Sequence, residues 1–81
     1  MPRRLKPANG QTKWLAKRHE EIAGELRAAR LRAGMTQAAV AKEVGVTAAF
    51  ISMVESGRAW PSVKGFLLIA KALDVRPETL L

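Results

Sequence analysis

The residues of this 81-residue chain that could do chemistry are mainly cations, and they are concentrated near the N-terminus. Residues 1–18 contain six Lys and Arg residues and no acid, whereas residues 19–81 contain eight bases and seven acids. The net charge of the whole chain is +7. Such a concentration of positive charge is typical of proteins that bind a polyanion, and nucleic acid is a more frequent partner than a membrane surface. The alternative is a solvated tail that binds nothing.

Groups suited to catalysis or to metal binding are scarce. The sequence has one His and no Cys, so it excludes disulfides and thiolate chemistry and offers few ligands for a zinc site. No nucleophile–base pair is recognisable. We therefore expect neither an enzyme nor a cofactor. The lack of cysteine, of a signal peptide and of a long apolar run favours a cytoplasmic protein with no membrane partner.

The elements that would position the cations are expected to be helices. The sequence contains no alternating apolar pattern and no hairpin turn, so it predicts an all-α, compact bundle of about five short helices. Residues 1–12 contain two prolines, an asparagine and a glycine, which favour a flexible basic arm. Residues 13–81 are then expected to form a single domain.

The first helix is predicted from apolar residues at steps of three and four, which lie on one face of an α-helix. Its start is open: Thr12 could cap a helix that begins at Lys13, or the helix begins nearer Glu20. Gly34 is the expected C-terminal stop. The residues of this face are Leu15, His19, Ile22, Leu26, Ala29 and Ala33.

Four shorter helices are predicted to follow. Thr36, Thr47 and Ser62 are expected N-caps, because each directly precedes a run with helical apolar spacing. Pro77 suits the first turn of the last helix. The expected core residues of these helices are Val40, Ala41, Val44, Phe50, Ile51, Val54, Phe66, Ile69, Ala70, Leu73 and the remaining leucines of the last two helices.

Residues 37–54 have the pattern of a helix-turn-helix. Two short helices separated by only a few residues must cross steeply, so their contact needs a small residue and the chain must reverse between them. Ala41 is small enough for that contact, and Gly45 can adopt the positive φ of the reversal. The apolar wedge that would fix the crossing angle consists of Val40, Val44, Val46, Ile51 and Val54.

The pattern continues on both sides of this segment. Outside residues 37–54 it includes Ile22, Leu26, Arg27, Arg30, Gly34, Glu55, Gly57, Arg58, Pro61, Ser62, Ala70, Leu73, Pro77 and Leu80. Over residues 22–81 the chain resembles the Cro/repressor-type (XRE-like) helix-turn-helix regulators of phages and bacteria. The resemblance implies a lambda-repressor-like bundle that binds double-stranded DNA through its third helix in the major groove, usually as a dimer on a two-fold site.

Three phosphate contacts are expected, and the resemblance implies those of Gln37 and Arg58. Gln37 begins the second helix, where its amide can face a phosphate. Thr47 can act both as a helix cap and as a phosphate ligand. Arg58 matches a loop position that often carries a cation against the DNA backbone. For Gln37 and Arg58 the alternative is an ordinary solvated side chain, and for Thr47 it is the helix cap alone.

The resemblance implies base reading at Ala48, Ala49 and Met53, with Ser52 beside them. Three of these four side chains are apolar and can meet thymine methyl groups without hydrogen bonding, so direct readout should contain few hydrogen bonds. One interpretation is that specificity comes from methyl contacts, DNA shape and the arm. The other is that the apolar face binds a protein. We favour DNA.

The arm suggests a further DNA contact. Arg3, Arg4 and Lys6 could reach around the duplex or enter a narrow minor groove. Each phosphate that they neutralise should steepen the dependence of binding on salt.

An ion pair is the structural role that the resemblance implies for Arg30 and Glu55. In similar proteins the matching residues form a buried salt bridge between the first and third helices, so both residues are expected to stabilise the fold.

The resemblance assigns no role to several aromatic and apolar residues or to His19. Trp60 is expected to close the core under its loop, with a DNA or subunit contact as alternatives, and His19 is expected to pack. Trp14 could cover the base of the bundle or mediate self-association. Leu80 and Leu81 need cover, either from a dimer partner or from a further segment of a longer chain.

The leading functional hypothesis is a sequence-specific transcriptional regulator that represses as a DNA-bound homodimer. The alternative is an antitoxin that regulates its own operon and binds a toxin protein, through the apolar face of the third helix or the Trp14 region. A third possibility is a bridging module with no specific DNA site.

Overall fold

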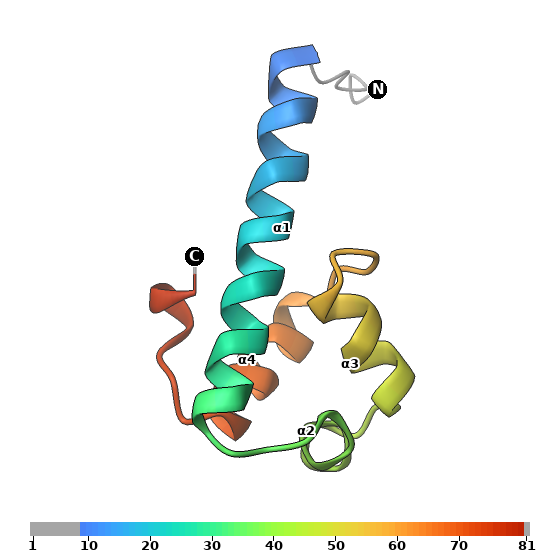
Figure 1. Cartoon of the computed structure of the whole chain (residues 1–81), viewed down its shortest axis with the longest axis vertical. Coiled ribbons are helices and arrows are strands. Elements are labelled where there is room, and N and C mark those ends of the chain that lie inside the picture. The colour runs from blue at the N-terminus through green and yellow to red at the C-terminus, as the bar shows by residue number, and fades with distance from the viewer. Residues whose placement is uncertain (1–8, 81) are drawn as a thin grey trace, which may run out of the picture.

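The computed structural model describes residues 9–80, and four α-helices and one 3₁₀ helix make up its regular structure (Figure 1). The elements are α1 (Asn9–Arg32), α2 (Gln37–Val44), α3 (Ala48–Glu55), α4 (Val63–Ala72) and η1 (Pro77–Thr79). The all-α prediction is confirmed, with a short 3₁₀ turn in place of a fifth α-helix. The sites expected at Arg3, Arg4, Lys6 and Leu81 lie outside the described residues.

The helix α1 begins earlier than either start that the sequence suggested. It begins at Asn9, so residues 9–12, expected in the flexible arm, are helical, and Thr12 lies inside the helix instead of capping it. Residues between Gln11 and Lys17 include several good helix formers, and extending an existing helix adds a hydrogen bond for each residue that is fixed. The predicted end is confirmed, because Gly34 follows the helix with a φ of 69°.

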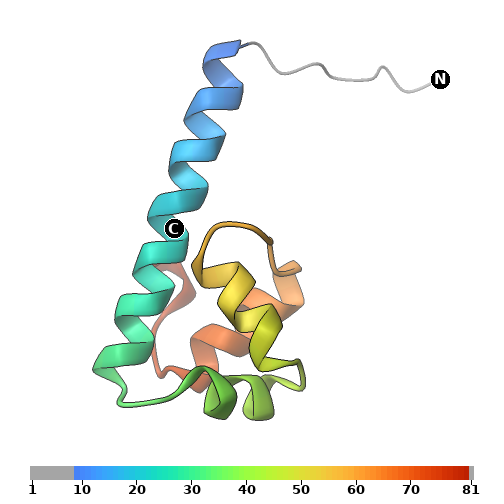
Figure 2. The same cartoon turned by 45° about the vertical axis from the view of Figure 1, so that its right-hand side comes forward.

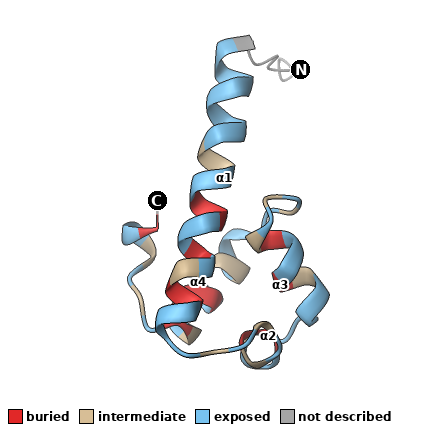
Figure 3. Cartoon of the chain, viewed as in Figure 1, coloured by how far each residue is buried: buried red, intermediate tan, exposed pale blue. Residues whose placement is uncertain are grey.

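The core lies between the C-terminal half of α1 and the other helices. Figure 3 shows buried residues in that half of α1, whereas its N-terminal half is mostly exposed. The buried apolar side chains are Ile22, Ala23, Leu26, Ala29, Val40, Ala41, Ile51, Val54, Ile69, Ala70, Leu73 and Leu80.

Leu80 needs no cover from outside this fold, contrary to expectation. Leu80 is only 3% exposed, because η1 turns the chain back onto the core. The Leu80 N–H donates to the Pro77 carbonyl at 3.0 Å and so closes that turn.

The predicted burial of several residues is wrong. Leu67 and Leu68 are exposed because α4 buries only one face, on which Ile69, Ala70 and Leu73 lie. Phe50, Phe66 and Val44 are half-buried and pack against the core edge. The other expected core residues that are exposed are Leu15, Ala33 and Val46.

The N-terminal half of α1 extends beyond the other helices. In Figures 1 and 2 the helix leaves the bundle as a single projecting rod, while its other half lies beside α3 and α4. We define residues 9–21 as the projecting half and residues 22–32 as the docked half. Buried residues first occur at Ile22, so this division follows the packing.

Across residues 9–80, no single helix has both the length and the hydrophobicity to cross a membrane. Together, α2 and α3 have the required length and hydrophobicity, but the two helices are bent by 111° relative to each other.

Candidate nucleic-acid interface

The helices α2 and α3 form a helix-turn-helix. They are bent by 111° relative to each other, within the range of about 90–120° that this motif shows. Gly45 has a φ of 84°, as its sequence position predicts, and its N–H donates to the Ala41 carbonyl at 2.8 Å. The Val46 N–H donates to the same carbonyl at 3.0 Å. Ala41 is buried at the contact, so the turn is built as its small residues suggested.

The starts of both helices are fixed by the predicted caps. The Thr36 hydroxyl oxygen accepts from the Ala39 N–H at 3.0 Å, and the Thr47 hydroxyl oxygen accepts from the Phe50 N–H at 3.0 Å. Both threonines have extended backbone, as N-caps require. Thr47 uses an oxygen lone pair for its cap, so its O–H proton remains a possible donor to a phosphate.

The exposed face of α3 contains every residue expected to read bases. Ala48, Ala49, Ser52 and Met53 are all exposed, and their spacing places them on one side of the helix. Ile51 and Val54, on the other side, are buried in the core. The arrangement brings the four together on a surface that is apolar except for one hydroxyl.

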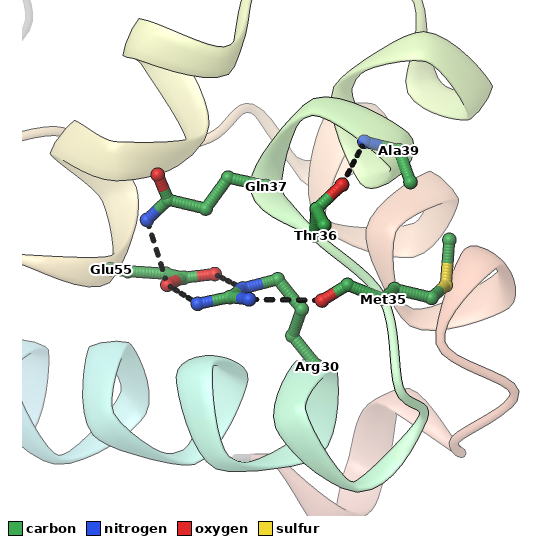
Figure 4. A network of polar contacts seen from close by, with 6 residues as sticks. All are labelled: Arg30, Met35, Thr36, Gln37, Ala39 and Glu55. Carbon is green, nitrogen blue, oxygen red and sulfur yellow. Dashed lines mark hydrogen bonds and ion pairs between the residues drawn. The ribbon is translucent and has the colours of Figure 1, made fainter.

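A polar network joins α1, α2 and α3 beneath this surface (Figure 4). Arg30 forms two hydrogen bonds with the Glu55 carboxylate: Nε donates to Oε2 at 2.7 Å and Nη2 donates to Oε1 at 3.0 Å. Arg30 Nη1 also donates to the Met35 carbonyl at 2.9 Å. The two side chains are only 10% and 6% exposed, so the pair is the buried bridge between α1 and α3 that the resemblance implies.

Gln37 joins the same network from the start of α2. Its Nε2 donates to Glu55 Oε1 at 3.2 Å, a contact that sequence reasoning missed because it links two residues in different helices. A glutamine amide has two N–H protons, and this bond uses one. The second N–H remains a possible donor to a phosphate.

The pKa of Arg30 is raised by its partner Glu55. The hydrogen bond to Glu55 raises the pKa of Arg30, against the opposing effect of burial, and the charge of Glu55 adds to the rise. A raised folded pKa stabilises the fold at every pH below the unfolded value, and this contribution is lost only as pH rises through the folded pKa. For an arginine that window lies far above neutral pH. The pair therefore contributes throughout the neutral range.

An open polar depression of about 270 Å³ lies where α1, α2 and α3 meet. Arg27, Gln37 and Ser52 are among the residues that line it, so an arginine of α1 lies near the exposed face of α3. Arg27 was not among the expected DNA contacts. The available signal was its position three residues before Arg30, which places it near the same face of α1.

The loop after α3 is held against α1. His19 Nε2 donates to the Ala59 carbonyl at 3.2 Å, and the rings of His19 and Trp60 stack with centroids 3.7 Å apart. His19 packs, as expected, but Trp60 does not close the core and is 49% exposed. A tryptophan that lies flat on a half-buried ring covers it with one face and leaves the other open. The Arg58 side chain is exposed in the same loop.

Among residues 9–80, no three His, Asp or Glu side chains are arranged to hold a metal ion.

Comparison with known proteins identifies the same motif. The helix-turn-helix family model HTH_3 matches residues 26–80. The restriction-modification controller protein C.AhdI from Aeromonas hydrophila has a similar structure, with 29% identity and a TM-score of 0.73 over 76% of this chain and 94% of that one. The P22 c2 repressor protein, solved in complex with a synthetic operator, is 35% identical with a TM-score of 0.70 over 74% and 91%.

A third structure supports the fold alone. The clp gene regulator ClgR from C. glutamicum is 24% identical, with a TM-score of 0.73 over 78% of this chain and 82% of that one. No curated protein sequence matches at the significance required. The family consists of DNA-binding regulators, which confirms the expectation that the chain is not an enzyme. Since the family match spans more than half of its residues, this chain belongs to the HTH_3 helix-turn-helix family of DNA-binding transcriptional regulators.

Proposed function

We propose that the protein is a sequence-specific transcriptional repressor that inserts α3 into the major groove and binds a two-fold site as a dimer. The observation that carries the proposal is the exposed α3 face, on which Ala48, Ala49, Ser52 and Met53 lie free of the core. The similarity to a repressor solved on a synthetic operator supports it.

The reading of DNA bases by this face would depend on shape and methyl contacts. Ala48, Ala49 and Met53 offer apolar surface to thymine methyl groups, and Ser52 offers one hydroxyl. A bidentate contact gives about 1–3 kcal/mol of discrimination for each base, and none of these four side chains can make one. We therefore expect an operator rich in thymine at the contacted positions.

Phosphate contacts would hold α3 in register. Gln37, Thr47 and Arg58 stay the proposed contacts, and we add Arg27, which lines the polar depression with Gln37 and Ser52. Such contacts fix orientation without reading sequence. The basic residues Arg3, Arg4 and Lys6 of the arm would add affinity that falls steeply with salt.

Selection of bound duplexes from a randomised pool, at about 0.15 M salt, tests the proposal, because non-specific binding weakens as salt rises. We expect an enriched palindrome with half-sites about one helical turn apart. The absence of enrichment, with binding that disappears as salt rises, would contradict sequence-specific recognition.

A matched pair of variants locates the reading face. Met53→Glu puts a carboxylate against the DNA and should weaken specific binding by at least about tenfold, which corresponds to 1.4 kcal/mol. Leu31→Glu makes a comparable exposed change on α1 and should bind as the unaltered protein does. Both variants should keep the melting temperature. Equal binding by both would place the reading face elsewhere.

An antitoxin function is a second candidate, supported by the apolar character of the same α3 face. In that case a toxin protein encoded beside the gene should co-purify with this chain. The Met53→Glu variant should then lose the toxin as well as the DNA.

A further inference from the structure

An apolar groove lies where the projecting half of α1 leaves the bundle. Its volume is about 260 Å³, and Ile22 and Leu26 of α1 contribute to its lining. Trp60, Val63 and Leu67 also line it, and all three side chains are substantially exposed. Large exposed apolar patches on small proteins mark interaction sites.

The projecting half of α1 presents apolar side chains of its own. Trp14 is 65% exposed and Leu15 is 49% exposed. Leu15 continues the row of His19, Ile22 and Leu26 by steps of four, three and four, so it lies on the same face of α1 as the groove. The bundle covers this row at Ile22 and Leu26 but leaves it exposed at Leu15.

The charges of α1 are divided along its length. Residues 10–18 contain only basic charges, at Lys13, Lys17 and Arg18, whereas residues 19–26 contain only acidic charges, at Glu20, Glu21 and Glu25. Arg18 and Glu21 already form an exposed pair at 3.1 Å within the helix. A second α1 laid antiparallel would place each basic segment beside the acidic segment of the other copy. A parallel arrangement would place like charges together.

We propose that a second copy of this chain covers the groove, through antiparallel pairing of the two α1 helices about a two-fold axis near Arg18 and His19. This pairing sets Leu15 of each copy opposite Ile22 of the other and Trp14 opposite Ala23. Each copy then covers the groove of its partner. The contact is closed and isologous, as two-fold symmetry requires.

The proposed surface is large enough for a small specific interface and leaves the exposed face of α3 uncovered. An aromatic side chain buries about 150–250 Å². Two copies each of Trp14, Trp60 and Leu15 would supply much of the roughly 1,200 Å² that a small specific interface needs. None of the four residues proposed to read bases lines the groove. This inference rests on the proposed function, since it assigns the surface of the proposed dimer.

Sedimentation equilibrium of the full chain without DNA tests the pairing. We expect the unaltered protein to be a dimer, and Leu15→Glu to raise its dissociation constant at least tenfold, because a carboxylate would be buried in the partner's groove. Leu31→Glu is the matched control, with the same substitution on an exposed leucine of the same helix, and should dimerise normally.

Reversing the charges of α1 distinguishes loss of the contact between subunits from misfolding of the chain. One variant carries Lys17→Glu and Arg18→Glu, and the other carries Glu21→Lys and Glu25→Lys. Each alone should be monomeric because like charges then oppose each other, whereas an equimolar mixture should form the heterodimer.

Three results would overturn the proposal: a monomeric protein at about 100 μM, where even a weak pair of micromolar affinity would assemble; a Leu15→Glu variant that still dimerises; or a charge-reversed mixture that stays monomeric. A monomer would leave the groove to a different protein, such as a toxin. Whichever of these results is found, the duplex selection still reports whether a specific DNA sequence is enriched, so failure of the dimer surface and failure of DNA recognition are distinguishable.

Discussion

The two halves of α1 are one continuous helix with opposite environments. The docked half, residues 22–32, contains Ile22, Leu26 and Ala29 in the core and Arg30 in a buried ion pair. In the projecting half, residues 9–21, every residue from Gly10 to Lys17 is exposed. The docked half is held by packing and an ion pair, whereas the projecting half contacts the rest of the domain at His19, which stacks on Trp60 and donates to the Ala59 carbonyl.

This difference separates the buried residues that stabilise the domain from the exposed residues that are available to a partner. Isolated helices shorter than about 12–15 residues are marginal in water, and most helical stability in proteins comes from tertiary packing. A helical segment without such packing gains most from a second surface. Substitutions of buried residues in the docked half should therefore change folding, and substitutions of the exposed apolar residues in the projecting half should change assembly.

Arg30→Ala should have the largest effect. Removing one member of a buried ion pair costs about 3–5 kcal/mol, because it leaves Glu55 buried without its main partner. This is a large share of the roughly 5–15 kcal/mol that stabilises a typical domain. Urea denaturation measures the loss. Arg32→Ala, an exposed control on the same helix, should change stability by less than about 0.5 kcal/mol. An Arg30→Ala protein with unchanged stability would contradict a structural role for the pair.

The same truncation in each half tests the division directly. Leu26→Ala should lower the free energy of unfolding by about 2–5 kcal/mol, because Leu26 is almost fully buried. Leu15→Ala, measured at a concentration where the chain is monomeric, should change it by less than about 0.5 kcal/mol. Similar losses at both positions would show that the projecting half packs against its own domain.

Gly24→Ala should have the smallest effect, with the opposite sign. Gly24 lies inside α1 near the junction of the halves, and an added Cβ meets no atom within 4 Å. Glycine within a helix is less stable than alanine by about 0.5–1 kcal/mol, so the variant should be more stable by about that amount. Thermal unfolding detects this change. A lower melting temperature would mean that the junction needs the flexibility of glycine.

The local features of the fold could be predicted from sequence because each depends on a few adjacent residues. Thr36 and Thr47 cap their helices, because a hydroxyl directly before a helix can accept from an N–H of the first turn. Gly45 makes the left-handed turn, because a residue without Cβ adopts a positive φ without strain. The four exposed residues of α3 also follow from helical spacing. Whether they bind DNA stays a prediction.

The misplaced residues depend on contacts between distant parts of the chain. The spacing of Leu67 and Leu68 fits an apolar helix, but only tertiary packing decides which face α4 buries. Trp60 lies on His19, forty-one residues earlier, and Gln37 reaches Glu55 across two helices. The early start of α1 has a different cause, since it follows from the extension of a helix whose docked half is already fixed.

The network in Figure 4 has a consequence for how recognition can change. Arg30, Glu55, Gln37 and the Met35 carbonyl hold α1, α2 and α3 together from beneath. None of the four exposed α3 side chains takes part in it. Exposed substitutions usually change stability by less than about 0.5 kcal/mol, so these positions can be exchanged with little effect on folding. The core and the polar network therefore do not depend on the exposed α3 side chains. Under the proposed function, a new DNA preference can arise by exchange of these side chains without rebuilding the core.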